Sequence, residues 1–245
     1  MDIDLNGDLG EGSPHDAALL ALVSSANIAC GYHAGDAETA ERTIRLALEQ
    51  GVTLGAHPGH ADRAHFGRRE LERTPAQVYL DTTYQVGALA ALARIHDAKL
   101  HFLKPHGALY HQAGRDLHWA ASLVRVCVEW ELALVGPPGT MLEQAAVGQC
   151  PFLGEGFADR RYGADGSLIP RTELDALIDL PDEAVAQVFS LVATGRYATI
   201  CIHGDHPAAL AFATQVRAAL LDAGHRIRSS FDSRTANGPA ANPDL

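Results

Sequence analysis

Residues 100–110 read Leu-His-Phe-Leu-Lys-Pro-His-Gly-Ala-Leu-Tyr, a short apolar run that changes abruptly into polar residues. The apolar side chains within residues 100–103 are typical of a buried strand. Pro105 lacks the backbone N–H that a central strand needs, so the strand must end before it. We therefore predict a buried strand that leads into a polar loop carrying Lys104 and His106.

The same change from apolar to polar residues recurs along the chain. Further predicted strands, each a short apolar run, are residues 3–5, 27–30, 52–56, 132–135, 151–154 and 197–202, with a weaker candidate at 226–228. Amphipathic spacing, N-cap residues such as Asp36 and Thr74, and glycines at the far ends predict helices between them. The predicted helices are residues 17–23, 37–50, 75–97, 116–130, 182–194 and 207–223.

Strands that alternate with helices predict parallel strands joined by right-handed crossovers. At this length we expect a single-domain α/β fold over residues 1–231, a (β/α) barrel of about seven parallel strands, with a doubly wound open sheet as the alternative. Residues 232–245 are turn-rich and poor in apolar residues, which predicts a disordered tail. In both folds ligands bind where the strands end, so the side chains that follow the strands should meet at one mouth.

Composition narrows the class of ligand. The 245 residues carry a formal charge of −11, which argues against nucleic acid and against an anionic membrane surface as partners. The N-terminus lacks the pattern of a signal peptide, and no apolar run is long enough for a transmembrane helix. The four cysteines contain no CxxC pair and indicate reduced thiols in a cytoplasmic protein, with Cys30 and Cys201 expected to pack in the core. A small-molecule ligand is the expected partner.

The candidate site consists of polar residues at six predicted strand ends. A single histidine at a strand end is more often a structural hydrogen-bonding group, but six strand ends at one barrel face favour function. In chain order the residues are Asn6, Asp8, Glu11, Asn27, His33, His57, Lys104, His106, Glu155, Asp159, His203 and Asp205.

Residues 58–73 form a connection without apolar periodicity that is unusually long for a compact domain. Arg68 and Arg69 in this loop suit a carboxylate or a phosphate, although an ordinary solvated loop explains them equally well. The length and position of the loop lead to the hypothesis that it closes over a substrate.

Seven blocks of this sequence resemble the signature blocks of the LamB/YcsF family, whose members are the A subunit of bacterial ATP-dependent 5-oxoprolinase. The match runs from about residue 4 to about residue 207, and Ala61 and His65 depart from the residues expected there. The blocks are residues 4–11, 26–36, 55–58, 66–69, 104–110, 155–160 and 203–205.

The resemblance implies a (β/α) barrel related to the glycoside hydrolase and deacetylase barrels. It also implies that 5-oxo-L-proline is opened to L-glutamate while ATP is hydrolysed to ADP and phosphate, with partner subunits B and C. The lactam is a stabilised amide, so activation of its carbonyl, for example by phosphorylation of the oxygen, makes attack by water feasible. Residues 136–140 lack the lysine of a P-loop, which fits an ATP site shared with or located on a partner.

Roles follow from this reaction as hypotheses. Asp8 or Glu11 is the general base for water, and Lys104 stabilises the developing oxyanion or the phosphoryl group. The acid or base partner is one of His57, His106 and His203. Arg68, Arg69 or Arg160 holds the substrate carboxylate. The other predicted substrate-binding residues are Asn6, Asn27, His33, Tyr110, Glu155 and Asp205.

Two rival functions remain open at this point. One is a stand-alone metal-dependent amidase or deacetylase in which Asp8, His57 and His106 bind a divalent ion that activates water. The other is a non-catalytic subunit that only binds 5-oxoproline or its partner subunits. Elemental analysis of the purified protein tests for the metal of the first rival. The second rival predicts that substitutions at the mouth abolish assembly with the partner subunits rather than turnover in an assembled complex.

Overall fold

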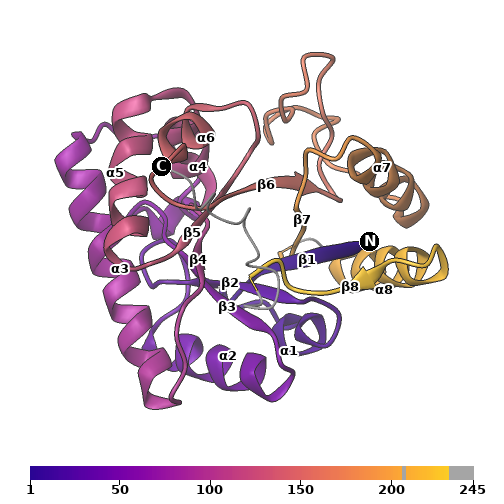
Figure 1. Cartoon of the computed structure of the whole chain (residues 1–245), viewed down its shortest axis with the longest axis horizontal. Helices are drawn as coiled ribbons and strands as arrows, with labels where there is room; N and C mark the ends of the chain where they lie inside the picture. Colours follow the sequence, from indigo (N-terminus) through magenta and orange to yellow (C-terminus); the bar gives the residue numbers. More distant parts are fainter. Residues whose placement is uncertain (206–207, 232–245) are drawn as a thin grey trace, which may run out of the picture.

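The computed structural model describes residues 1–205 and 208–231, which form a barrel of strands surrounded by helices (Figure 1). The strands are β1 (Asp2–Leu9), β2 (Ser25–Ala29), β3 (Thr53–His57), β4 (Phe102–Leu103), β5 (Ala133–Gly136), β6 (Phe152–Phe157), β7 (Thr199–His203) and β8 (Arg226–Ile227). The helices are α1 (Asp16–Leu20), α2 (Ala37–Glu49), the 3₁₀ turn η1 (Arg63–His65), α3 (Pro75–Ile95), α4 (Gly107–Arg115), α5 (Leu117–Glu129), α6 (Met141–Ala146), α7 (Pro181–Ala193) and α8 (Ala209–Asp222).

The barrel closes because β1 pairs in parallel with both β2 and β7. The order β1 to β7 around the barrel follows the chain, and β8 adds to the first residues of β1 outside this ring. The prediction of a (β/α) barrel with about seven parallel strands is therefore confirmed, and the open sheet is excluded. The predicted tail at residues 232–245 lies outside the described residues, as do residues 206 and 207 at the predicted start of the last helix.

Local signals in the sequence place the caps of two long helices correctly. The Asp36 carboxylate accepts the Thr39 N–H at 2.8 Å at the start of α2. Thr74 and Gln77 form the reciprocal capping box of α3, with Pro75 at its first position.

Three predicted boundaries are wrong, and all three errors bear on the site. Residues 6–8 belong to β1 and not to the predicted loop, and Glu155 lies within β6 rather than after it. Parallel neighbours on both sides satisfy the backbone of these residues, so their polar side chains can be buried in the barrel. The polar loop predicted after Lys104 is only a short connection, because α4 begins at Gly107.

Alternate residues of β1 and β7 line the inside of the barrel. Asn6 donates its Nδ2 hydrogen to Thr199 Oγ1 at 2.7 Å, and Asp4 accepts from the hydroxyl of Ser25 at 2.8 Å. The interior is polar at the amino ends of the strands as well, where Ser25 Oγ also lies 3.0 Å from Ser229 Oγ. Phe102 stacks on Phe231 with ring centroids 4.1 Å apart and packs in a small apolar cluster with Ala133 and Val135.

Across residues 1–205 and 208–231, no helix combines the length and the apolar character needed to cross a bilayer.

Candidate active site

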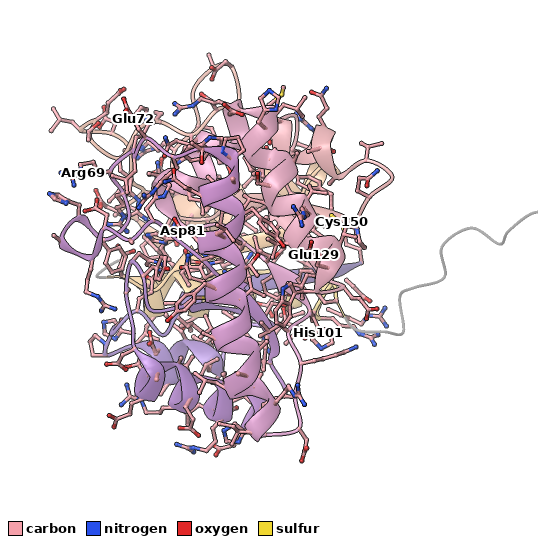
Figure 2. The ribbon with its side chains drawn as sticks, turned by 90° about the vertical axis from the view of Figure 1, so that its left-hand side faces the viewer. Arg69, Glu72, Asp81, His101, Glu129 and Cys150 are labelled. Atoms are coloured by element: carbon pink, nitrogen blue, oxygen red, sulfur yellow. The ribbon has the colours of Figure 1, made fainter. Side chains whose placement is uncertain are left out.

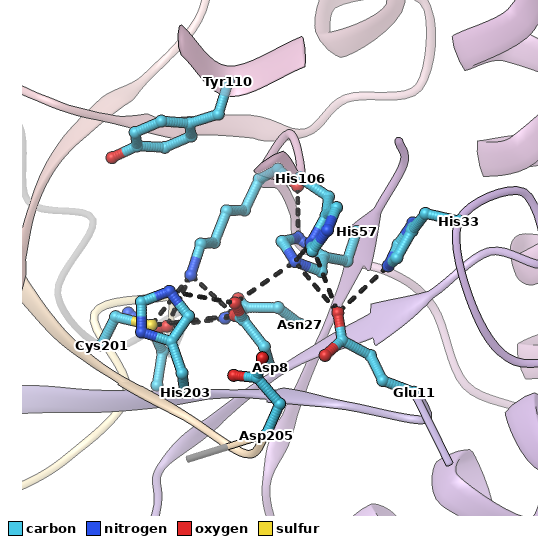
Figure 3. A network of polar contacts seen from close by, with 12 residues as sticks. Asp8, Glu11, Asn27, His33, His57, His106, Tyr110, Cys201, His203 and Asp205 are labelled. Atoms are coloured by element: carbon cyan, nitrogen blue, oxygen red, sulfur yellow. Dashed lines mark hydrogen bonds and ion pairs between the residues drawn. The ribbon is translucent and has the colours of Figure 1, made fainter. Parts of the chain in front are cut away.

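Asp8 lies at the centre of a buried polar cluster at the carboxyl ends of the strands (Figure 3). Its Oδ1 accepts hydrogen bonds from Lys104 Nζ and Asn27 Nδ2, both at 2.7 Å. Lys104 Nζ also lies 2.9 Å from Glu155 Oε1 and 3.0 Å from Cys201 Sγ. Side chains from five different strands or their exits thus converge around one ammonium group, as the strand-end argument predicts.

Charge pairing keeps this centre ionised although it is buried. Burial raises the pKa of Asp8, but the Lys104 ammonium, together with His57 and His203, holds that pKa well below its usual range. Burial likewise lowers the pKa of Lys104, but Asp8, then Cys201 and Glu155, raise it well above its usual value. The pair therefore supplies a fixed positive charge beside a fixed carboxylate.

Glu11 lies beside three imidazole rings, next to the Asp8 cluster. Its Oε1 is 3.1 Å from His33 Nε2, 3.4 Å from His106 Nδ1 and 3.8 Å from His57 Nε2. His57 also connects the two groups, because its Nε2 lies 3.4 Å from Asp8 Oδ2. The four side chains come from the exits of β1, β2, β3 and β4.

The pKa values around Glu11 favour neutral groups. Burial, followed by the charge of Asp8, raises the pKa of Glu11 well above its usual range. Burial also lowers the pKa of His33 and of His106 well below the usual value for histidine, with neighbouring imidazoles adding to the effect. Glu11 is therefore better suited to exchange a proton than the strongly ionised Asp8.

His203 forms a carboxylate–imidazole pair with Asp159 on the other side of Asp8. The Nδ1 atom of His203 lies 2.8 Å from Asp159 Oδ1, and its Nε2 lies 3.9 Å from Asp8 Oδ2. Burial raises the pKa of Asp159, but the charge and hydrogen bonds of His203, together with the charge of Arg171, lower it to about 2. Asp159 thus fixes the orientation of an imidazole whose other nitrogen faces the centre.

Tyr110 joins the cluster through a hydrogen bond to Glu155. The Tyr110 hydroxyl donates to Glu155 Oε2 at 2.9 Å, while the other oxygen of Glu155 faces Lys104. Burial and the charge of Glu155 raise the pKa of Tyr110 well above its usual value, so the phenol stays protonated.

The candidate arginines lie in different environments. Arg68 lies at the mouth, where it forms an ion pair with Asp205 and its guanidinium lies 4.8 Å from the centre of the Phe66 ring. Arg160 is buried and donates to the carbonyl of Ile169 at 2.6 Å, and Arg69 lies at the outer edge of the molecule in Figure 2. The structure thus brings Arg68 to the mouth, while Arg160 serves backbone carbonyls and Arg69 pairs with Asp62.

Two residues at the site carry no functional role in the sequence-based prediction. Cys201 is predicted there only as a packing residue, yet its thiol lies against Lys104. Its position two residues after Thr199 and two before His203 on β7 is a signal that could have found it. Arg171, whose Nη1 lies 3.4 Å from Asp205 Oδ2, comes from the long connection between β6 and α7, where the sequence gives no such signal.

A cavity of about 290 Å³ opens onto this cluster. Glu11, Phe66 and Asp205 line it together with residues 12–15 and Gly204. A larger surface hollow of about 680 Å³ lies between residues 70–73 and the helices α4 and α5, and none of the candidate residues lines it. Of these two cavities, the smaller one therefore meets the buried cluster, at Glu11.

Comparisons with known proteins agree with this fold. The LamB/YcsF family model matches residues 3–235. A curated relative from Nocardia farcinica, whose name is that of the A subunit of 5-oxoprolinase, is 46% identical over 91% of this chain and 97% of its own length.

Solved structures include a lactam utilization protein from Thermus thermophilus, which is 39% identical. It has a TM-score of 0.87, with 93% of this chain and 99% of that chain covered. A family 4 carbohydrate esterase from Streptomyces lividans is only 14% identical, with a TM-score of 0.56 over 92% of this chain and 90% of that one, so it shows a shared fold alone. On the family match and the identity to its relatives, the chain belongs to the LamB/YcsF family.

Proposed function

We propose that this chain is the A subunit of an ATP-dependent 5-oxoprolinase and opens the lactam of 5-oxoproline to glutamate. The relative from Nocardia farcinica carries the name of that subunit, and the lactam utilization protein has the same fold. The observation that carries the proposal is the pairing of a permanently charged Lys104–Asp8 centre with a proton-exchanging Glu11 at one cavity. Opening an amide requires both a stabilised oxyanion and a proton transfer to nitrogen.

Each residue has a defined task in this proposal. In its ionised form Glu11 accepts a proton from the attacking water, because its raised pKa makes this carboxylate a stronger base than Asp8, and it returns the proton to the lactam nitrogen as the C–N bond breaks. Lys104 stabilises the negative charge that develops on the carbonyl oxygen or on a phosphoryl group bound to it. Glu11 replaces Asp8 as the favoured base, because the Asp8 carboxylate is already neutralised by Lys104 and lies deeper than the cavity lining.

The substrate carboxylate fits best near Arg68 and Arg171. Both guanidinium groups contact Asp205, which lines the cavity. A carboxylate that enters the cavity can share these cations with Asp205 or take its place.

ATP is assigned to a site outside the turn after β5. In that turn the Gly139 N–H already donates to a carboxylate of the chain itself, Glu143 Oε2, at 2.6 Å. We propose that partner subunits B and C contribute the nucleotide site. We also propose that the protein is cytoplasmic, as the absence of a CxxC pair among its four cysteines predicts.

The test is ATP-dependent glutamate release from 5-oxoproline by this chain, alone and with the candidate B and C subunits encoded nearby. We expect release only in the mixture. We also expect Glu11→Gln to lower kcat by at least about 100-fold while the subunits still assemble, as general acid–base catalysis contributes 10²–10⁴-fold. Full activity of a well-folded Glu11→Gln variant would exclude the proposed role, and loss of assembly instead of turnover would support a non-catalytic subunit.

A further inference from the structure

Three side chains at the exits of β1, β3 and β4 are spaced as ligands of one metal ion. The distances are 3.0 Å between His57 Nε2 and His106 Nδ1, 3.4 Å between His106 Nδ1 and Glu11 Oε1, and 3.8 Å between Glu11 Oε1 and His57 Nε2. Zinc–ligand bonds of about 2.0–2.2 Å in a tetrahedral site place the ligand atoms roughly 3.3–3.6 Å apart. The triangle therefore has the size that a single tetrahedral ion spans.

The hydrogen bonds of the two histidines fix where their lone pairs point. His57 Nδ1 lies 2.8 Å from the carbonyl oxygen of Lys104, and His106 Nε2 lies 2.8 Å from the carbonyl oxygen of Phe66. A carbonyl oxygen only accepts, so each of these nitrogens carries the hydrogen and the other nitrogen carries the lone pair. The two lone pairs face each other across 3.0 Å, where only a proton or a cation can prevent their repulsion. Metal-binding histidines commonly donate their second N–H to a backbone carbonyl in this way.

His33 belongs to the same cluster by distance but fits a different task. Its ring is parallel to that of His106 within 4°, with centroids 3.8 Å apart. An imidazole binds a metal in its own plane, so one ion cannot lie in both of these planes. His33 Nε2 instead lies 3.1 Å from Glu11 Oε1, and its Nδ1 has no hydrogen-bond partner among the described residues. This arrangement suits a ring that donates its Nε2 hydrogen to Glu11 and orients that carboxylate.

Lys104 excludes a cation from the neighbouring cluster of Asp8, Cys201 and His203. The ligand atoms of these three residues also lie within 4.8 Å of one another. The Lys104 ammonium, however, is 2.7 Å from Asp8 Oδ1 and 3.0 Å from Cys201 Sγ, so a metal there would meet a like charge at close range. The geometry thus favours Glu11 over Asp8 as the carboxylate ligand beside His57 and His106.

We propose that Glu11, His57 and His106 bind one divalent first-row cation, with His33 as the positioning residue of Glu11. Two histidines and a glutamate with an open fourth position form a known type of zinc site, and Glu11 also lines the cavity. The inference rests on the proposed function and concerns the same mouth. A bound ion makes Glu11 a ligand in place of the general base, so the two roles of Glu11 compete, whereas the opening of the lactam can stand with either. The test measures metal binding without turnover, so its failure is distinct from a failure of the proposed function.

The experiment is a calorimetric titration of the chelator-treated full chain with Zn²⁺, together with the visible spectrum of its Co²⁺ complex. We expect one equivalent of Zn²⁺ per chain and the intense bands of four-coordinate Co²⁺. Glu11→Gln, His57→Gln and His106→Gln should each weaken Zn²⁺ binding by more than about 100-fold, the upper loss typical of second-shell residues. His118→Gln is the matched control, because His118 is exposed on α5. Absence of stoichiometric binding in the wild-type chain, or wild-type affinity in all three variants, would overturn the proposal.

The role of His33 is tested through the visible spectrum of the Co²⁺ complex. This test needs no substitution of the three proposed ligands, so it stands even if those variants fold poorly. His33→Phe removes the donor to Glu11 and should weaken binding by about 10–100-fold without moving the Co²⁺ bands. His33→Gln keeps an N–H donor and should recover most of that affinity. A shift of the Co²⁺ bands in both His33 variants would show that His33 is a ligand and would overturn its assignment.

Discussion

Lys104 is the residue on which the buried charges of the site depend. Its ammonium lies 2.7 Å from the carboxylate of Asp8 and 2.9 Å from that of Glu155, and its side chain is only 2% exposed. Buried ion pairs contribute little net stability over an apolar pair, but removing one partner leaves the other charge buried without compensation. Lys104 is thus both a structural counter-ion and the proposed electrostatic catalyst.

We predict that Lys104→Met lowers the free energy of unfolding by about 3–5 kcal/mol at neutral pH, because two carboxylates lose their cation. Urea unfolding measures this, with Lys99→Met, an exposed lysine, as the control that should stay within about 0.5 kcal/mol. The double variant Lys104→Met/Asp8→Asn should lose less than the sum of the two single losses. Simple additivity would show that the two side chains are not energetically coupled.

Asp159 gives a pH-dependent prediction. Its pKa is about 2 in the folded protein against an ordinary value of 3.8, so its contribution is present above about pH 4 and is lost as the pH falls from about 4 to about 2. The difference corresponds to roughly 2 kcal/mol. Asp159→Asn should therefore be less stable than the wild type at about pH 6 by that amount, and the gap should narrow below about pH 4. A gap that is constant across this range would contradict the assigned ion pair with His203.

The residues of the site were predictable to different degrees. Asp8, Lys104 and His203 follow from the rule that parallel strands collect polar groups at their carboxyl ends. Cys201 and Arg171 required the structure, because the register of β7 and the path of the β6–α7 connection depend on contacts between distant segments.

At the level of elements, capping signals were the most reliable part of the prediction. Thr74 and Gln77 act within one turn of helix, so the local sequence determines their geometry. The sequence places the ends of β1 and β6 too early, because polar residues continue both strands. Pairing with neighbouring strands keeps these residues extended, and the local sequence pattern does not reveal that pairing. The start of α4 directly after His106 was hidden by Pro105 and Gly107, which locally favour a loop.

Close packing between strands leads to a prediction for Gly55 on β3. A methyl group at this position would overlap the ring of Phe102, which is itself stacked on Phe231 and cannot move aside freely. Gly55→Ala should therefore destabilise the protein by about 1–3 kcal/mol.

The matched control is the same substitution at Gly87, within α3. There the nearest atoms, in Trp130, lie at an ordinary 3.5 Å, and alanine is a better helix former than glycine by roughly 1 kcal/mol. Thermal unfolding of Gly55→Ala and Gly87→Ala should shift in opposite directions. Shifts of the same sign would mean that the barrel relaxes around Phe102.

On the scale of the whole molecule, closure of the barrel gathers the chemistry at the carboxyl ends of the strands. Seven strands close on themselves because β1 has two parallel neighbours, a feature that the alternation of strands and helices predicted but could not prove against an open sheet. Closure gathers Lys104 and its carboxylate partners in one cluster, and the Phe102–Phe231 stack lies outside that cluster. In barrels of this type the loops at the carboxyl end carry function, and the opposite end serves stability.

A variant outside the charged cluster should therefore change stability and leave turnover unchanged. Phe231→Ala removes the ring stacked on Phe102 at 4.1 Å and should lower the free energy of unfolding by about 2–3 kcal/mol, toward the low end for a core phenylalanine because Phe231 is only partly buried. In the assembled enzyme its kcat and KM for 5-oxoproline should stay within twofold of the wild type at a temperature where both are folded. Glu11→Gln should show the converse, a large loss of kcat with little loss of stability, since burial already favours the neutral form of Glu11. A Phe231→Ala enzyme that unfolds normally but turns over slowly would show that the Phe102–Phe231 stack is coupled to the charged cluster.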